Sequence, residues 1–394
     1  MAHKKSKTST KQQIPQASNS TAHILRLPVE LIEYIGHTAR RKDLLVLRQT
    51  CRDIRDGIQR PFARVYFVEK TFMLPDPESM SALKYISEHV IFRKEMRKIH
   101  FVSLQARNDE PDSFALQYSE PREPEGPGRE EFRAKMRERR RRCTELPIEQ
   151  KKYDREYKWS PVLTEALRNF KISPGKMHIT LPKTRSNYGV EACGLESIYR
   201  LYGIDYCMAS VKRGDEEHLM GTEFLRAIIK GSCPIGGLEI TALRLGIDIP
   251  VRTLEDLSAF GAAPTVFAGL RILDIRVNRH LWLEDGEATS ERLLDFLGGA
   301  QSIENLTLRC PDRGQPVFDH FIAIATLPRL QHLSLYASFP KLDNILAFTK
   351  RHEQTLKRVI GNRLHPGVWD DILVPVRHEM KRVHPGIEFF FSRD

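Results

Sequence analysis

The sequence predicts an α/β protein in which a small N-terminal helical unit precedes a solenoid of strand-helix repeats. Three observations support this prediction: two short amphipathic patterns near the N-terminus, a strand signature that recurs later in the chain, and helix-like patterns between its copies. We place the helical unit at 24–66 and the repeat domain at 67–394, with a basic tail at 1–23 and an insertion at about 106–158. A chain of 394 residues is long enough to bury a sizeable core in such an arrangement.

The helical unit is expected to begin at the Leu27-Pro28 step. Proline in the first turn of a helix loses no intrahelical hydrogen bond and fixes φ in advance. Apolar residues then recur at helical spacing in two stretches joined by a polar link from Thr38 to Lys42. The first stretch holds Leu31, Ile32 and Ile35, and the second holds Leu44, Leu47, Cys51 and Ile54. Two short helices cannot bury all of these side chains on each other, so another surface is expected to cover the remainder.

The pattern L-P-x-E-L-I-x-x-I, followed by D-L-L-x-L-R-x-T-C-R at 43–52, resembles the F-box, especially its fungal F-box-like form. The resemblance covers about 40 residues. It implies a helical unit that binds the Skp adaptor, and through it the cullin scaffold, of an SCF-type (cullin–RING) ubiquitin ligase. The positions that match the motif, and that the resemblance assigns to Skp-adaptor binding, are Leu27, Pro28, Leu31, Ile32, Ile35, Leu44, Leu47, Arg48 and Cys51. The alternative is an ordinary helical hairpin that closes the end of a larger domain.

A strand signature, apolar-x-x-apolar-x-apolar, recurs after the helical unit. Its copies start at Met96, Ile240, Leu270, Ile303 and Leu330, and a degraded copy starts at Leu356. From residue 240 onward the starts are 30, 33, 27 and 26 residues apart. Recurrence at this scale is typical of a solenoid.

Helix-like patterns lie between these strands. Ser290 is expected to cap a helix that Gly298-Gly299 ends, and the stretches 318–325 and 342–348 take the same place in the next two repeats. One strand plus one helix about every 30 residues is the plan of leucine-rich repeats. One copy supplies Asn278 where that family uses asparagine to bond the turning backbone, whereas the other copies depart from the pattern. We therefore expect irregular leucine-rich repeats.

The formal charge of +11 is unevenly distributed. The tail at 1–23 carries four lysines and no acidic residue, and its composition predicts disorder. The insertion begins with a Pro- and Gly-rich part and continues with a basic core at 137–142. Clustered arginines are typical of nuclear import or of phosphate contacts, but glutamates three or four residues away favour a solvated charged helix. A nuclear, nucleic-acid-associated protein is therefore kept as an alternative hypothesis. The preferred interpretation is the solvated charged helix, for which no nucleic-acid partner is expected.

Sequence motifs for catalysis or for a cofactor are absent. The chain has no phosphate-binding G-x-x-x-x-G-K-[ST], no G-x-G-x-x-G, no G-x-S-x-G and no H-E-x-x-H. Its six cysteines form no C-x-x-C pair, and Cys193 with His178 or His218 is weak support for a thiol nucleophile. No stretch approaches the roughly 18 consecutive apolar residues of a membrane span. We expect no enzyme, no cofactor, no metal and no membrane contact, and a cytoplasmic or nuclear location.

The resemblance also implies that the repeat domain binds a substrate protein. Repeat proteins bind on the concave face formed by their strands, so the outward strand positions are candidate contacts. These are Arg244, Asp274, Arg276, Thr307, Arg309, Ser334 and Tyr336. Three arginines with one acid favour an acidic substrate segment no more strongly than they favour a solvated sheet. A repeat-type scaffold without a ligase partner is the remaining hypothesis, and it requires Leu31, Ile35, Leu44 and Leu47 all to face inward.

Overall fold

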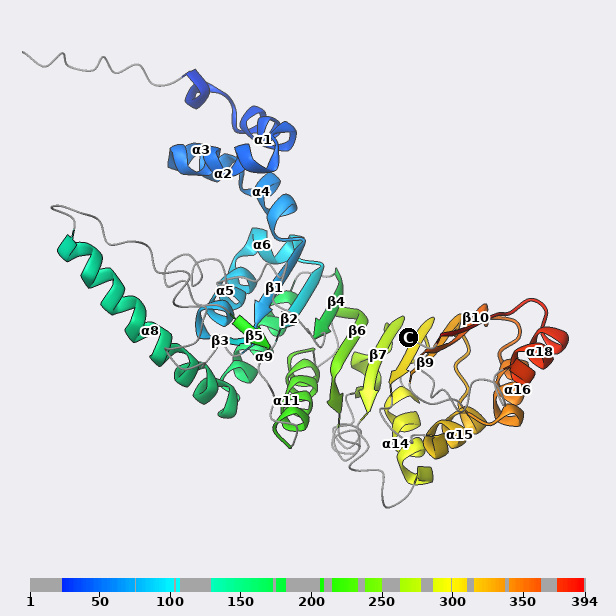
Figure 1. Ribbon diagram of the computed structural model, residues 1–394. Coiled ribbons are helices and arrows are strands. Elements are labelled where there is room, and N and C mark those ends of the chain that lie inside the picture. The colour runs from blue at the N-terminus through cyan, green and yellow to red at the C-terminus, as the bar shows by residue number, and fades with distance from the viewer. Residues whose placement is uncertain are drawn as a thin grey trace, which may run out of the picture. The chain divides into compact units, whose positions relative to one another are not determined.

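The computed structural model describes residues 23–74, 76–102, 104–106, 129–172, 175–181, 206–208, 215–232, 238–249, 263–277, 286–298, 300–309, 315–336, 340–362 and 374–392. The chain divides into two units, Met1–Val65 and Tyr66–Asp394 (Figure 1). Predicted features that lie outside the described residues include the basic tail up to residue 22, the Pro- and Gly-rich segment at 107–128, and Asn278.

The first unit is helical. It contains η1 (His23–Arg26), α1 (Val29–Thr38), α2 (Arg41–Thr50) and α3 (Arg52–Gly57), and α4 (Gln59–Tyr66) runs to its boundary. Pro28 is the N-cap residue of α1, and its carbonyl accepts the amides of Leu31 and Ile32 at 3.0 and 3.2 Å. The Leu27-Pro28 step therefore begins a helix, as the sequence predicts.

Cys51 divides what the apolar spacing predicted as one helix. α2 ends at Thr50, Cys51 has an extended backbone with φ of −155°, and α3 begins at Arg52. The break allows α3 to contact both α1 and α2. Gly57 at the end of α3 lies against α1 so closely that an added Cβ would stand 2.7 Å from Cγ2 of Ile32. Close approach of the helix backbones, which glycine permits, thus completes the core of this unit.

The second unit is built on a nine-stranded sheet in which all neighbouring strands are parallel and follow one another in chain order. The sheet is open rather than closed, because its first and last strands do not pair with each other. The strands are β1 (Glu69–Met73), β2 (Lys98–Val102), β4 (Gly175–Leu181), β6 (Leu238–Ile249), β7 (Ile272–Val277), β8 (Asn305–Arg309), β9 (His332–Tyr336), β10 (Arg358–Asn362) and β11 (Glu388–Ser392). The predicted α/β class is confirmed.

Each copy of the strand signature coincides with a strand. In most copies the strand begins two residues after the first apolar residue, which is itself buried, as at Leu270, Ile303 and Leu330. The signature misses β1, β4 and β11. β1 carries Lys70 at the position that pairs with Ile99 of β2, and β11 has three consecutive phenylalanines instead of spaced apolar residues.

The same backbone hydrogen bonds recur from strand to strand. The carbonyl of Arg271 accepts the amides of Glu304 and Asn305 at 2.8 and 2.9 Å. The carbonyl of Glu304 in turn accepts the amides of Gln331 and His332 at 2.8 and 2.9 Å. These bonds lie just before the strands and fix the register of each strand on its predecessor.

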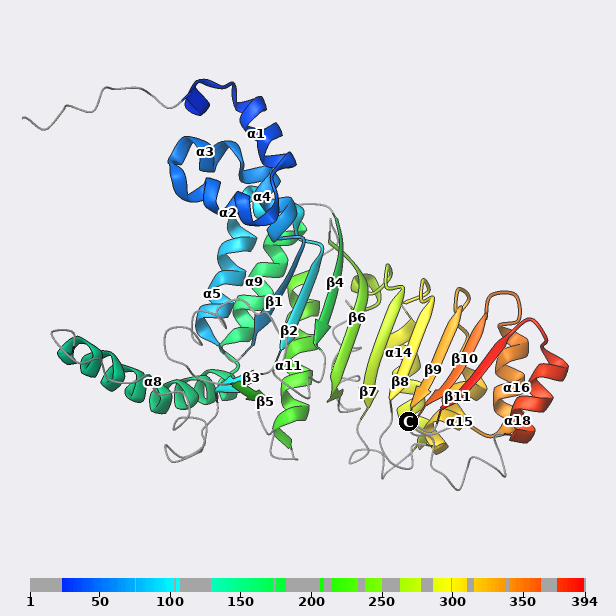
Figure 2. The same ribbon diagram turned by 45° about the horizontal axis from the view of Figure 1, so that its top comes forward.

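Helices cover one face of this sheet, as Figures 1 and 2 show. They include α5 (Pro77–Glu88), α6 (Val90–Glu95), α9 (Trp159–Lys171), α11 (Asp215–Ser232), α13 (Ala263–Val266), α14 (Gly286–Gly298), α15 (Gln315–Ile324), α16 (Leu342–Arg351) and α18 (Val374–Val383). Successive helices contact each other, from α5 through α9 to α11 and from α14 through α15 to α16. Strand side chains that face the helices are buried, whereas those between them remain partly exposed on the opposite face, called here the open face.

The predicted cap at Ser290 is wrong. α14 begins at Gly286, and Ser290 is a buried residue inside the helix. Glutamate and alanine precede it, and these good helix formers extend the helix toward the N-terminus. The predicted end at Gly298 is confirmed.

Part of the insertion contacts the rest of the sheet unit. It contains α8 (Arg129–Arg155). At its beginning, β3 (Leu104–Ala106) pairs antiparallel with β5 (Tyr206–Met208), which comes later in the chain, in a two-stranded sheet. Near the end of α8, the buried amide of Gln150 donates to Oδ1 of Asp76 at 3.1 Å. Asp76 also caps α5 by accepting the amide of Ser79 at 2.7 Å, and burial raises the pKa of its carboxyl. A polar contact thus ties the end of α8 to the first helix of the sheet unit.

His352 connects two consecutive helix-strand segments. Its Nε2 accepts the amide of Leu327 at 2.9 Å, so the neutral ring carries its hydrogen on Nδ1. That Nδ1 lies 2.8 Å from the carbonyl of Phe348 and donates to it. Burial lowers the pKa of His352, which keeps the ring in the neutral form that these two bonds require.

We predict that His352→Ala lowers the free energy of unfolding by about 1–3 kcal/mol, because it leaves the buried amide of Leu327 without its acceptor. The pKa of His352 is lower in the folded state than its ordinary value of 6.5, so this residue removes stability as pH falls through that value. Urea unfolding of both proteins at pH 7.5 and pH 5.5 measures the two effects. The variant should lose less stability than the wild type between these pH values, and an equal loss would contradict this role.

Candidate functional site

The residues assigned to Skp-adaptor binding divide between the surface and the core of the helical unit. Ile32 and Leu44 are buried, and Leu44 has no exposed surface. Their assignment as partner contacts is corrected, because both side chains hold the helices together. The others lie at the surface: Pro28 and Leu31 are exposed, and Leu27, Ile35, Leu47, Arg48 and Cys51 are half-buried.

Arg48 also has a contact within the unit. Its guanidinium carbon lies 4.0 Å from the centroid of the Phe62 ring in α4. A cation over an aromatic face is stabilising, and the planar guanidinium is well suited to it. Arg48 therefore joins α2 to α4, which gives it an internal function that the motif did not reveal.

Several large apolar side chains of α1 and α2 are exposed. Leu31 is 49% exposed and Tyr34 is 65% exposed, and they lie three residues apart on α1, on the same side of the helix. We use the term exposed apolar surface for this set, which consists of Val29, Leu31, Tyr34, Leu45 and Val46. The inward packing of Leu31 that the scaffold hypothesis requires is wrong, and the positions assigned to adaptor binding include only this one member of the set. The missing signal was available in the sequence, because these residues are apolar at helix positions that the core spacing does not use.

The open face of the sheet is the second candidate surface. Strand register brings the predicted substrate contacts into two rows across it. One row runs from Arg244 through Asp274 and Thr307 to Ser334, and the other joins Arg276, Arg309 and Tyr336. All seven are at least partly exposed, so the sequence correctly placed them on one face.

Arg309 is already neutralised in the second row. Its Nε and Nη2 each donate to a carboxylate oxygen of Asp274 at 2.8 Å, and its guanidinium carbon lies 4.3 Å from the centroid of the Tyr336 ring. The hydrogen bond to Asp274 raises the pKa of Arg309. A two-pronged ion pair of this kind leaves little charge for a partner. Arg309 is therefore no longer one of the three arginines that would attract an acidic substrate segment, and the argument for such a substrate is weaker.

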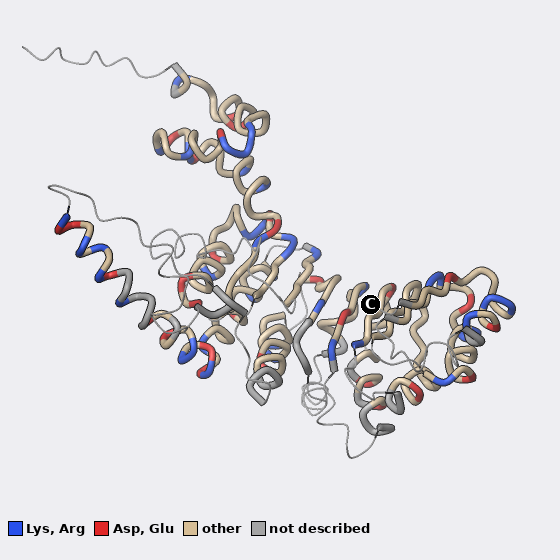
Figure 3. The backbone as a smooth tube through the Cα atoms, in the orientation of Figure 1, with Lys and Arg blue, Asp and Glu red and all other residues tan. Residues whose placement is uncertain are grey.

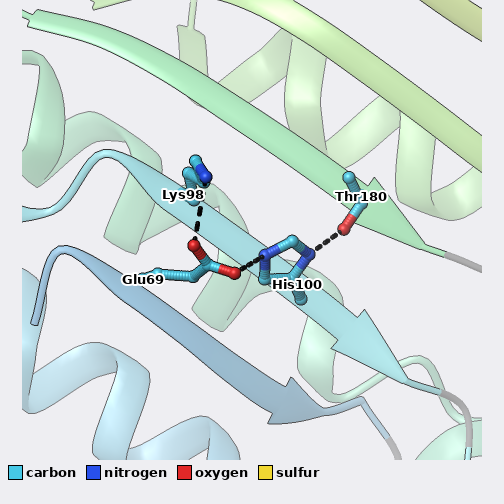
Figure 4. Close-up of polar contacts among 4 residues, drawn as sticks. All are labelled: Glu69, Lys98, His100 and Thr180. Carbon is cyan, nitrogen blue, oxygen red and sulfur yellow. Dashed lines mark hydrogen bonds and ion pairs between the residues drawn. The ribbon is translucent and has the colours of Figure 1, made fainter.

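A polar network occupies the other end of the open face, across β1, β2 and β4 (Figure 4). Glu69 bridges two residues of β2, with Oε2 3.1 Å from Nζ of Lys98 and Oε1 2.9 Å from Nε2 of His100. Nδ1 of His100 contacts the hydroxyl of Thr180. The hydrogen bond from Lys98 is the main reason why the pKa of Glu69 is lowered. Because the carboxylate can only accept, the neutral form of His100 carries its hydrogen on Nε2, and in that form the Thr180 hydroxyl donates to Nδ1.

Sequence reasoning missed this network. Its members come from three strands, and His100 and Thr180 are 80 positions apart in the chain. No local pattern marks such a group, since only the register of the folded sheet brings it together.

The described residues offer no grouping of three or more His, Cys, Asp or Glu side chains that could hold a metal ion. Cys193 lies outside the described residues, and so does the side chain of His218. His178 is described and faces the open side of the sheet, where its pKa is lowered by burial and then by the charges of Lys98 and Arg244. In the part of the chain that the structure describes, none of the helices is long and apolar enough to cross a membrane.

The basic segment of the insertion forms a helix with interspersed charges (Figure 3). Arg141 makes ion pairs with Glu138 and Glu145 at 2.6 and 2.8 Å, and Lys135 pairs with Glu131 at 2.9 Å. These contacts have the i,i+3 and i,i+4 spacing expected of a solvated charged helix. They favour that interpretation over a nucleic-acid surface.

No protein-family model matches this chain, and no curated protein matches it. The functional argument is therefore based on the exposed apolar surface of the helical unit and on the open face of the sheet.

We predict a clear contrast between two leucines of the F-box-like motif. Leu44→Ala should lower the free energy of unfolding of the helical unit by about 2–5 kcal/mol, because it removes a fully buried side chain. Leu31→Ala should change it by less than about 0.5 kcal/mol, because Leu31 is half-exposed. Thermal unfolding followed by circular dichroism compares the two. Equal destabilisation would mean that Leu31 belongs to the core and is unavailable to a partner.

Proposed function

We propose that this chain is the substrate-recognition adaptor of an SCF-type cullin–RING ubiquitin ligase. In this proposal the helical unit binds the Skp adaptor, and through it the cullin scaffold, while the open face of the sheet binds a protein substrate. The observation that carries the proposal is the exposed apolar surface of α1 and α2, on a unit distinct from the sheet. The chain then acts by binding rather than by catalysis, needs no cofactor, and works in the cytoplasm or the nucleus.

The exposed apolar surface has the chemistry that a stable protein contact requires. Isolated exposed apolar residues are common on proteins, but Leu31 and Tyr34 lie together on one side of α1, and grouped apolar side chains of this kind support an interaction site. Tyr34 adds an aromatic ring with a polar tip, the type of side chain that often dominates binding energy at interfaces. Ile32 of α1 and Leu44 of α2 are buried, so each helix is anchored in the core of the unit by a side chain other than those it exposes.

We propose further that the sheet unit is an irregular leucine-rich-repeat solenoid. The order of the strands along the chain, their parallel pairing and the hydrogen bonds repeated before successive strands all support this assignment. In such a solenoid each repeat buries its apolar side on its neighbours and leaves the strand face for a ligand. The open face is then the substrate surface, with Arg244, Arg276 and Tyr336 among its contacts.

A repeat-type scaffold that binds no ligase is the second candidate. The inward packing of all four leucine and isoleucine side chains that the sequence led us to expect of it does not hold, because Leu31 is half-exposed. The internal contacts of Ile32, Leu44 and Arg48 nevertheless give part of the F-box-like motif a structural explanation. The two candidates differ in one property, which is direct binding to the Skp adaptor.

We predict that Leu31→Asp combined with Tyr34→Asp weakens binding to purified Skp adaptor by more than tenfold. Burying a carboxylate without a partner in an interface costs several kcal/mol, and about 1.4 kcal/mol corresponds to tenfold in affinity. Both side chains are exposed, so the variant should remain folded. Isothermal titration calorimetry measures the affinity, and circular dichroism checks the fold.

The matched control is Ile172→Asp combined with Val90→Asp, which places the same two charges at residues that are 65% and 53% exposed in the sheet unit. It should bind the Skp adaptor like the wild type. Failure of the wild-type chain to bind the adaptor would reject the ligase proposal in favour of the scaffold. Equal weakening by the control would reject the exposed apolar surface as the binding site.

A further inference from the structure

One segment of the open face holds an arginine, Arg244, whose charge no described neighbour neutralises, beside Lys98 and His178. It lies where β2, β4 and β6 are paired, and the register aligns Lys98 with His178 and aligns His100, Thr180 and Arg244 in the next row. Alternate strand residues share a face, so these side chains emerge on the same side. We use the term cationic segment for Lys98, His178 and Arg244.

Two carboxylates flank the cationic segment, and both are already occupied. Glu69 on one side binds Lys98 and His100. Asp274 on the other side is the register partner of Arg244, but both of its oxygens accept from Arg309. Arg244 is exposed and makes no hydrogen bond or ion pair with any other residue that the structure describes.

The pKa of His178 is affected by the charges around it. Burial lowers its pKa first, and the nearby Lys98, Arg244 and His100 lower it further, while Glu69 opposes them. An imidazole among cations resists protonation because a further positive charge is repelled. An anion bound between His178 and Arg244 would remove that repulsion.

We propose that the cationic segment is a binding site for a phosphate-class dianion, that is, the phosphate monoester of a phosphorylated side chain or of a small molecule. The Arg244 guanidinium presents a planar fork of donors that suits phosphate oxygens, and His178 supplies a second donor. Lys98 adds charge while it is held by Glu69. The hydroxyl of Thr180 is hydrogen-bonded to Nδ1 of His100, so it is not counted among the donors of the site.

The extent of the cationic segment favours a single phosphate over a nucleic acid. A nucleic-acid backbone presents a charge every few ångströms and binds to a continuous track of cations. Here the row that holds Arg244 continues with Asp274, Thr307 and Ser334 and adds no further cation, and Arg309 is paired with Asp274. The inference is independent of the proposed ligase function, because it uses only residues of the sheet.

Nuclear magnetic resonance of the His178 ring tests this proposal on the full chain, with the signal assigned from His178→Gln. The probes are O-phospho-L-serine, inorganic phosphate, and an acetylated Gly-Ser-Gly-phosphoserine-Gly-Ser-Gly peptide, each at constant ionic strength. Addition of a probe should shift the His178 signal in a saturable manner and raise its titration midpoint. Sodium chloride at the same ionic strength should do neither.

Arg244→Gln should weaken binding of the probes at least tenfold, because it removes the charged fork. The control is Arg329→Gln, which removes an exposed arginine elsewhere in the sheet unit and should leave affinity unchanged. Absence of a saturable shift with every probe, or equal weakening in both variants, would overturn the proposal. Tighter binding of the peptide than of the two small probes would identify a phosphorylated side chain as the source, and equal binding would identify a small phosphate ester.

Discussion

In-register parallel pairing of the strands is the constraint on which the sheet unit depends. Amides at the start of successive strands donate to a carbonyl just before the preceding strand, as the amides of Glu304 and Asn305 do to the carbonyl of Arg271. Parallel strands need crossover connections, and in this unit the helices of those connections gather on one face and bury alternate strand side chains (Figures 1 and 2). The remaining side chains are then forced onto the open face in rows. Both the Asp274–Arg309 pair and the network around His100 are consequences of that alignment.

The helical unit follows a different principle, which is the division of apolar residues between a small core and a surface. Leu44 and Ile32 fill the space between short helices, and Gly57 allows α3 to approach α1 closely. A unit of this size cannot enclose all of its apolar residues, because small domains bury a smaller fraction of their surface. Leu31 and Tyr34 are left outside, and this exposure gives the unit its proposed function.

The repeated strands were predictable because their signature is local. Buried residues such as Leu273 and Ile275 recur at fixed spacing, so the positions of β7 to β10 could be inferred from the sequence. The start of α14 was less predictable, since Ser290 has cap chemistry but lies among residues that continue a helix. The motif in the helical unit had a similar limit. It marked Leu31 and Leu44 alike, although one is a surface residue and the other a core residue.

The sequence by itself determined the α/β class, the helical start at Pro28, the recurring strands and the set of residues that share the open face. These features follow from periodicity, which each short segment carries within itself. Only the tertiary structure decided which of those residues neutralise each other. Arg309 meets Asp274 and Glu69 meets His100, whereas Arg244 is left without an ion pair among the described residues. Such pairings depend on the register between strands that are distant in the chain, and no single segment encodes that register.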